Sequence, residues 1–258
     1  MTEYFTIAII SLFASGLTLF SGFGLGTILT PVFALFFPIE LAIALTAIVH
    51  FLNNIFKLVL LGKNADKAVV LRFGIPAILA AFLGAYVLTL LAGLQPLFQY
   101  TLSGKTLAVT PVKLTIALLL AFFSLFDIVP KLSGLQFSRK LLPVGGLLSG
   151  FFGGLAGTQG ALRSAFLVRA GLTKETFVAT GVVIACLIDI SRLTIYSKQI
   201  AENGDRFDYT LVTVATLSAF AGAYIGSKLL KKVTIVTLQY IVAVMLLIFS
   251  VLLGAGII

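Results

Sequence analysis

Long stretches of this chain carry no charged side chain, and that feature constrains the fold more than any other. The first uncharged run extends from Tyr4 to Ile39, and others cover residues 73–104, 141–162, 209–227 and 233–258. Predominantly apolar runs of about 18 or more residues are typical of membrane-spanning helices. Only 10% of all residues are charged, against roughly 25% in soluble domains. We therefore predict an all-α, polytopic membrane protein that has the lipid bilayer as its surroundings.

The net charge of +9 does not indicate a nucleic-acid partner. Most of the basic residues fall in short loops between apolar runs, where an excess of Lys and Arg is usual on the cytoplasmic side. The single cysteine, Cys186, excludes an intramolecular disulfide framework. The charge therefore reports membrane topology, and we predict no nucleic-acid binding.

The chain contains two copies of one design. An offset of 134 residues aligns small residues in the same order: Ser15-Gly16 with Ser149-Gly150, Gly26 with Gly160, and Thr46 with Thr180. An offset of 138 aligns "AFLGAYV" (81–87) with "AFAGAYI" (219–225), whose small residues predict close helix packing. Self-similarity at a fixed offset indicates a repeat. We predict a first repeat over 1–127, a cytoplasmic linker over 128–140 and a second repeat over 141–258.

The first apolar segment of each repeat must break. Residues 4–37 as one helix would measure roughly 51 Å, whereas the hydrocarbon core is about 30 Å thick. Three alternating glycines in "SGFGLGT" (21–27) permit a break there, and "GGLAGTQG" (153–160) is its counterpart. Each segment is either a re-entrant hairpin or a kinked single span.

Loop charges favour re-entrant hairpins. If both segments return to the side they entered from, the inside loops hold 12 Lys and Arg and the outside loops hold 4; these inside loops are 57–72, 128–140, 169–175 and 228–232. Eight plain spans would split the same residues 9 to 7. The positive-inside rule therefore predicts two inverted repeats, each a hairpin followed by three transmembrane helices. The protein is then a multi-pass protein of the cell membrane with both termini on the outer side. Inverted repeats with broken helices are a recurring transporter architecture.

Arg163 lies just after the second break, in "GTQGALRSAF" (157–166). Its guanidinium is always protonated and offers a planar set of donors. With Thr158, Gln159 and the N–H groups of the returning arm, it can bind an oxyanion. The alternative is a structural arginine that caps carbonyls of the opposite hairpin or reaches an interface.

A polar stripe marks the second helix of the first repeat. His50, Asn53, Asn54 and Lys57 follow the spacing i, i+3, i+4, i+7, so they share one helix face. That face would be costly toward lipid, and we expect it in the bundle interior. It is either a lining of the transport route, with His50 as a proton carrier, or a hydrogen-bonded seam between helices.

The equivalent helix of the second repeat carries Thr180, Asp189, Arg192 and Tyr196. Asp189 and Arg192 have i, i+3 spacing and can pair on one face, and Tyr196 extends that face. The pair is either a neutralising structural contact or, with His50, a proton or charge relay. No enzyme or metal motif occurs in the sequence, so we predict neither an enzyme nor a bound cofactor or metal.

The sequence resembles the sulfite exporter TauE/SafE family of membrane transporters over nearly its whole length. The resemblance is carried by "SGFGLGTILTP" (21–31), "ALTAIVHFLNN" (44–54) and "GLLSGFFGGLAGTQGALRSAFLVRAGLTKETFVATG" (146–181). It implies export of small anions, sulfite or organosulfonates, across the cytoplasmic membrane. By motif it points to Gly22, Gly24, Gly26, Pro31, Thr46, Gly157, Gly160 and Thr180.

We accordingly predict a transporter that moves a small oxyanion by alternating access between the two hairpin tips. The predicted substrate-binding residues are Arg163, Thr158, Gln159, Gly157, Gly160, Gly22, Gly24, Gly26, Thr27, Asn53, Asn54, Thr46 and Thr180. The predicted relay is His50, Asp189 and Arg192. Two alternatives stay open: a cation or metabolite carrier with an essential Asp189, and a non-transporting membrane assembly or sensor protein. Whether the chain forms a homodimer also stays open.

Overall fold

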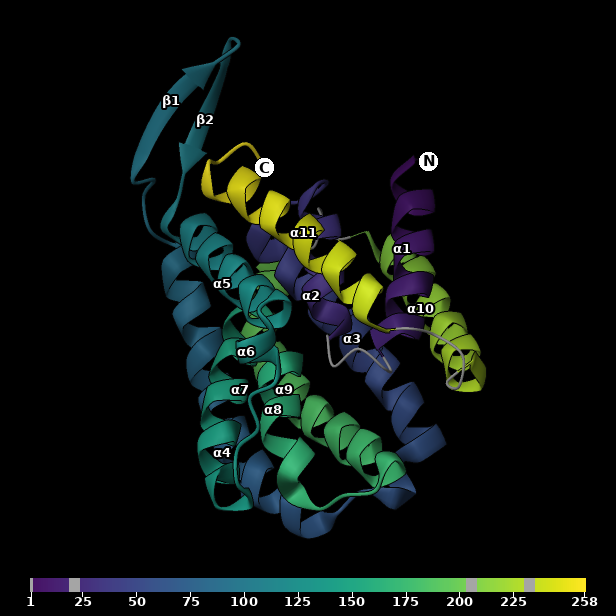
Figure 1. The fold of residues 1–258 in the computed structure, drawn as a ribbon. Helices are drawn as coiled ribbons and strands as arrows, with labels where there is room; N and C mark the ends of the chain where they lie inside the picture. The colour runs from purple at the N-terminus through teal and green to yellow at the C-terminus, as the bar shows by residue number, and fades with distance from the viewer. Residues whose placement is uncertain (1, 19–23, 203–207, 230–234) are drawn as a thin grey trace.

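The computed structural model describes residues 2–18, 24–202, 208–229 and 235–258. Over this part of the chain the elements are, in order, α1 (Thr2–Thr18), α2 (Leu25–Ala34), α3 (Ile39–Leu61), α4 (Lys67–Ala92), β1 (Phe98–Leu102), β2 (Lys105–Val109), α5 (Pro111–Ile128), α6 (Pro130–Ser133), α7 (Leu142–Ala156), α8 (Gly160–Leu167), α9 (Lys174–Glu202), α10 (Tyr209–Leu229) and α11 (Ile235–Gly254). Short 3₁₀ turns η1 (Gly62–Asn64), η2 (Arg139–Leu141) and η3 (Val168–Ala170) complete them. Figure 1 shows a bundle made almost wholly of helices.

Among the described residues, α3, α4, α9 and α10 are long and apolar enough to cross a membrane. Helices α1, α2, α5 and α11 add shorter apolar segments. Large hydrophobic side chains also lie exposed along the outside of the bundle, for example Leu79 and Leu83 on α4. Such an exterior suits lipid, which confirms the predicted all-α polytopic membrane protein.

The second predicted break is described directly, and the first through its returning arm alone. In the first segment, α2 starts at Leu25, directly after Gly24. In the second, α7 ends at Ala156, and Gly157 follows in the left-handed region, with φ 74° and ψ 3°, where glycine is the residue that fits without strain. The returning arms α2 and α8 have only 10 and 8 residues. They are therefore about 15 and 12 Å long, too short to cross a ~30 Å core. These lengths support the re-entrant hairpins; Gly22 of the first break lies outside the described residues.

The contacts between helices are symmetrical between the halves. Helix α4 packs along α7, and α1 packs along α10 in the same way; α3 packs on α9 and α5 on α11. The helices α1–α5 of the first half correspond in order to α7–α11 of the second. Exchanging the two sets turns the α4–α7 pair into the α1–α10 pair and leaves the α3–α9 and α5–α11 pairs unchanged. The symmetry supports the predicted repeats, while their boundaries and their inverted orientation stay predictions.

Glycine lets the paired helices approach backbone to backbone. A Cβ added to Gly84 on α4 would lie 2.1 Å from the carbonyl oxygen of Phe151 on α7. A Cβ added to Gly222 on α10 would lie 1.9 Å from the carbonyl oxygen of Leu12 on α1. Small residues at such crossings are a usual means of packing helices in membranes. The packing role predicted for the two Gly-Ala-Tyr motifs is confirmed for their glycines.

A β-hairpin after α4 was not predicted. Strands β1 and β2 pair antiparallel, and their two-residue turn, Ser103 and Gly104, has φ 51° and 78°. Positive φ at both positions is the signature of a type I′ turn. The Tyr100 hydroxyl donates to the carbonyl oxygen of Ala255 at 2.6 Å, which ties the hairpin to the C-terminal segment. The Ser-Gly dipeptide was the available sequence signal.

Both termini and the β-hairpin lie toward the same end of the bundle (Figure 1). At this end the Tyr4 hydroxyl donates to the Asp208 carboxylate. This bond, helped by the N–H of Leu211, holds the pKa of Asp208 below its ordinary value. The N-terminus and Asp208 therefore share one end, as the hairpin topology requires. That both termini are outside the cell stays a prediction.

Candidate functional site

The two glycine breaks meet inside the bundle. A Cβ added to Gly26, at the start of α2, would lie 3.1 Å from the carbonyl oxygen of Gly157 in the second break. Both residues are buried. The start of the first returning arm thus contacts the second break, and we call this the contact between the tips. The predicted transport route depends on this juxtaposition.

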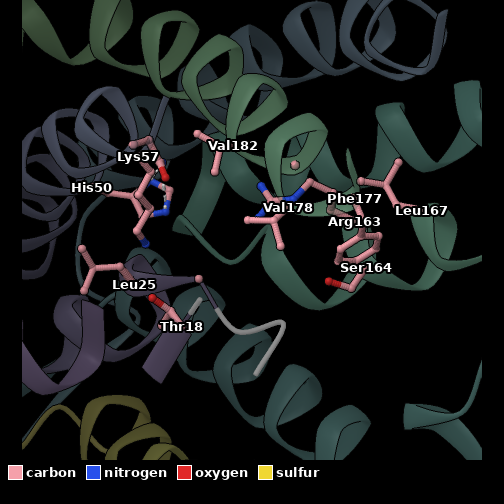
Figure 2. A pocket seen from close by; sticks show the side chains of 13 residues that line it. Thr18, Leu25, His50, Lys57, Arg163, Ser164, Leu167, Phe177, Val178 and Val182 are labelled. Atoms are coloured by element: carbon pink, nitrogen blue, oxygen red, sulfur yellow. Dashed lines mark hydrogen bonds between the residues drawn. The ribbon is translucent and has the colours of Figure 1, made fainter. Parts of the chain in front are cut away.

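A cavity of about 90 Å³ opens beside the tips. One water molecule needs only roughly 10–15 Å³ by the same kind of measure, so several waters or one small anion can enter. Figure 2 shows His50 and Lys57 of α3 on one side, with Arg163 and Ser164 of α8 on the other. Asn54 and Thr18 add polar groups, and the rest of the lining is apolar or glycine. The cavity lies between the two halves.

Two cations line this cavity, and no carboxylate does so among the described residues. Lys57 is only 6% exposed, and Arg163 is partly buried. In the amide orientation that satisfies its neighbours, Asn53 accepts a hydrogen bond from Lys57 Nζ at 3.2 Å. This acceptor is neutral, so the two basic side chains have no carboxylate facing them across the lining, and such a lining favours an anion.

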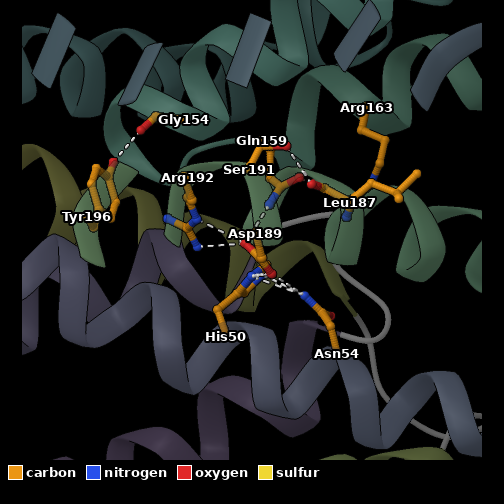
Figure 3. Close-up of polar contacts among 10 residues, drawn as sticks. All are labelled: His50, Asn54, Gly154, Gln159, Arg163, Leu187, Asp189, Ser191, Arg192 and Tyr196. Carbon is orange, nitrogen blue, oxygen red and sulfur yellow. Dashed lines mark hydrogen bonds and ion pairs between the residues drawn. The ribbon is translucent and has the colours of Figure 1, made fainter. Parts of the chain in front are cut away.

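Asp189 lies next to the cavity, at the centre of a polar cluster drawn in Figure 3. It is fully buried. Its Oδ2 contacts His50 Nδ1 at 2.7 Å and accepts from Asn54 Nδ2 at 3.0 Å. Its Oδ1 accepts from Arg192 Nε at 3.0 Å, and Arg192 Nη2 lies 2.8 Å away. The predicted Asp189–Arg192 pair is therefore confirmed, and it compensates the buried carboxylate within the protein.

Gln159 connects this cluster to Arg163. Its Nε2 lies 3.5 Å from Asp189 Oδ1, and its Oε1 accepts from Arg163 Nη1 at 3.2 Å. The backbone oxygen of Gln159 also accepts from the Ser149 hydroxyl at 3.1 Å. Both ends of the side chain are engaged and it does not line the cavity. Its place in the structure is behind Arg163, where it orients the guanidinium.

The other predicted site residues divide into groups. Gly24, His50, Asn54 and Arg163 line the cavity. Gly26, Thr46, Gly157 and Thr158 lie at the contact between the tips or next to it along the chain. Thr27 and Gly160 are buried in the first turns of α2 and α8. Thr180 accepts a hydrogen bond from the backbone N–H of Asp66 at 2.9 Å, away from the cavity lining.

The polar stripe of α3 faces the interior as predicted, because all four of its residues are buried; these are His50, Asn53, Asn54 and Lys57. Sequence reasoning placed Lys57 on this stripe but also counted it among the loop charges. The loop assignment was wrong, since Lys57 lies within α3. Lys57 also lines the cavity, although it was not among the predicted site residues. Ser164 and Thr18 were also missed. The i+7 spacing from His50 was the signal for Lys57.

The protein-family comparison agrees with this architecture. The family model described as sulfite exporter TauE/SafE matches residues 7–253, which includes both breaks, both polar helices and the cavity. No curated protein and no solved structure is significantly similar to the chain. The match covers nearly the whole sequence, so the chain belongs to the sulfite exporter TauE/SafE family of membrane transporters.

Proposed function

We propose that the protein exports a small oxyanion of the sulfite or organosulfonate class across the cytoplasmic membrane. Its substrate enters the cavity between α3 and α8, where Lys57 and Arg163 attract the negative charge. Family membership supports the class of substrate. Guanidinium and ammonium donors suit a sulfonate or sulfite because charge-assisted hydrogen bonds to oxyanions are among the strongest in proteins.

The observation that carries this proposal is the charge of the cavity lining. Lys57 and Arg163 both line it, and no Asp or Glu among the described residues does so. Ionisable groups at membrane depth are costly and mark substrate routes by default. Two like charges directed at one cavity are stabilised when an anion lies between them.

The alternative function, a cation carrier with an essential Asp189, has less support from the structure. Such a carrier would need Asp189 open to its substrate, but Asp189 is fully buried and bonded to Arg192, His50 and Asn54. A cation at this carboxylate would have to displace Arg192. The arrangement therefore favours an anion in the cavity over a cation at Asp189.

The contact between the tips supports transport by alternating access as part of this proposal. Gly26 and Gly157 meet beside the cavity, so a relative movement of the two halves would open a passage between them. Rocking of one repeat against the other is the usual form of alternating access. One negative charge that leaves a cell negative inside gains about 2.3 kcal/mol per 100 mV, so export is downhill without a coupled ion. His50, which lines the cavity and contacts Asp189, is the proposed entry to a proton relay.

Sulfite efflux from proteoliposomes tests the proposal. Arg163→Gln and Lys57→Gln should each slow efflux by about tenfold or more, since a hydrogen bond to a charged group is worth roughly 1.5–3 kcal/mol. Lys63→Gln is the matched control, because Lys63 is exposed in η1 and should transport normally. Efflux at the wild-type rate from folded Arg163→Gln and Lys57→Gln would contradict an anion site in this cavity.

A further inference from the structure

Three residues at or beside the contact between the tips have a buried donor with no hydrogen-bond partner among the described residues: Arg192 through its Nη1, and Thr46 and Thr158 through their hydroxyls. We propose that they form a second anion site, distinct from the Lys57–Arg163 cavity and closed in this conformation. The inference deepens the proposed function and rests on it.

Arg192 supplies the charge of this site. Its guanidinium is 0% exposed, and its Nε and Nη2 are directed at Asp189. Its Nη1 lies instead against the second break, 2.9 Å from the position that a Cβ on Gly157 would take. Only glycine leaves that nitrogen uncovered. A buried guanidinium donor without a partner is costly, and that cost is relieved when an oxygen ligand arrives.

The two threonines lie at or beside the same contact, one from each half of the chain, and each has a buried hydroxyl without a partner. Thr46 of α3 contacts the start of α2, its Cγ2 lying 3.6 Å from the position of a Cβ on Gly26. Thr158 directly follows Gly157, whose carbonyl oxygen lies 3.1 Å from the same Cβ position. An unpartnered guanidinium nitrogen thus lies at the contact between the tips, and each of the two threonines next to it carries a buried, unpartnered hydroxyl. That donor set suits an oxyanion.

The contact between Gly26 and Gly157 shows why the site is closed here. Backbone meets backbone at this point, so an anion fits only after the tips separate. The Lys57–Arg163 cavity lies beside the contact between the tips, whereas the residues with unpartnered donors lie at the contact itself or next to it. The anion moves from the first site to the second as the tips part, and weak binding at several sites in succession is what lets an ion both enter and leave.

Valine substitutions separate the second site from the first. Thr46→Val and Thr158→Val remove a hydroxyl with no partner and keep the shape, so thermal stability should be unchanged or slightly higher. Equilibrium sulfite binding, measured by calorimetry on the purified protein, should stay within about twofold of wild type because the cavity is intact. Sulfite efflux from proteoliposomes should fall about tenfold, the loss expected for one hydrogen bond to an anion.

Thr216→Val is the matched control. Thr216 is likewise buried with an unpartnered hydroxyl, but it lies on α10, which packs against α1 and α3. This variant should bind and release sulfite like wild type.

The outcomes distinguish this inference from the proposed function. If wild type neither binds nor releases sulfite, the proposed function fails and the second site with it. If wild type is active and both valine variants release sulfite at the wild-type rate, only the second site is overturned. If binding falls in proportion to efflux, the threonines belong to the first site and a separate second site is again ruled out.

Discussion

The two halves of the molecule share a scaffold but not its chemistry. At the 134-residue offset both helices of the α3–α9 pair carry the same threonine, Thr46 or Thr180. Their polar residues then diverge. His50, Asn54 and Lys57 align with Ile184, Ile188 and Ser191, while Asp189 and Arg192 align with Ile55 and Leu58. Arg163 on α8 aligns with Leu29 on α2.

This difference shows how a duplicated bundle acquires one asymmetric site. Each repeat packs the same glycines against the partner helix, because the backbone approach must be the same in both. At the positions aligned with His50, Asp189 and Arg192, only one of the two repeats carries a polar or charged residue. The polar residues of α3 then meet those of α9 where the two helices pack. Two copies of the same charge would repel, whereas the diverged copies place Asp189 opposite His50 and leave Lys57 and Arg163 for the cavity.

The largest expected effect comes from removing the central charge of the second half. Asp189→Ala leaves Arg192 buried without a carboxylate and should reduce the free energy of unfolding by about 3–5 kcal/mol. Asp189→Ile with Arg192→Leu installs the residues of the first half at both positions and should recover most of that loss. Chemical denaturation in detergent measures both. Equal instability of the single and double variants would show that the charge imbalance is not the cause.

The shared scaffold gives the next effect. Gly84→Ala and Gly222→Ala place a methyl group against a backbone carbonyl in their respective halves, and each should cost about 1–3 kcal/mol in unfolding free energy. The two losses should be similar because the contacts, at 2.1 and 1.9 Å, are similar. Gly93→Ala is the control, since its Cβ would meet no atom closer than 3.6 Å. A loss in only one half would mean that the repeats do not pack alike.

His50 tests the chemistry that only the first half has. It lines the cavity and contacts Asp189, so it joins the cavity to the buried carboxylate. His50→Asn keeps a polar side chain but removes the imidazole from this proposed relay, so sulfite efflux should slow while equilibrium sulfite binding stays near the wild-type value. Efflux from proteoliposomes and calorimetric binding measure the two. Efflux at the wild-type rate would rule out a relay through His50.

The smallest effect concerns the hydrogen bond between the N-terminal helix and the start of α10. The pKa of Asp208 is lowered by Tyr4 and by the Leu211 N–H, so the ionised form stabilises the fold. That contribution is complete at neutral pH and is lost as the pH falls below the ordinary value for Asp, about 3.9. Asp208→Asn should lower the melting temperature slightly at pH 7, and the difference should shrink as the pH falls below about 3.9.

Local geometry explains which features could be predicted. The i, i+3, i+4, i+7 spacing of the α3 stripe and the i, i+3 spacing of Asp189 and Arg192 depend only on helix periodicity, and both are buried as expected. Gln159 was different, because its role depends on Asp189 and Arg163 lying on either side of it. Strand β1 and the hairpin turn lie at the end of the uncharged run 73–104, where apolar composition favoured a helix, and β2 begins at the charged Lys105.

By itself the sequence determined the membrane setting, the two breaks and the inward-facing polar stripes, because charge, chain length and helix periodicity are properties of a single segment. Only the tertiary structure decided which stripes meet, that Asp189 is compensated internally, and that Lys57 and Arg163 share a cavity. Those outcomes depend on which helix packs against which. The residues on one helix face do not determine which other helix will cover it, because that choice is made by the packing of the whole bundle.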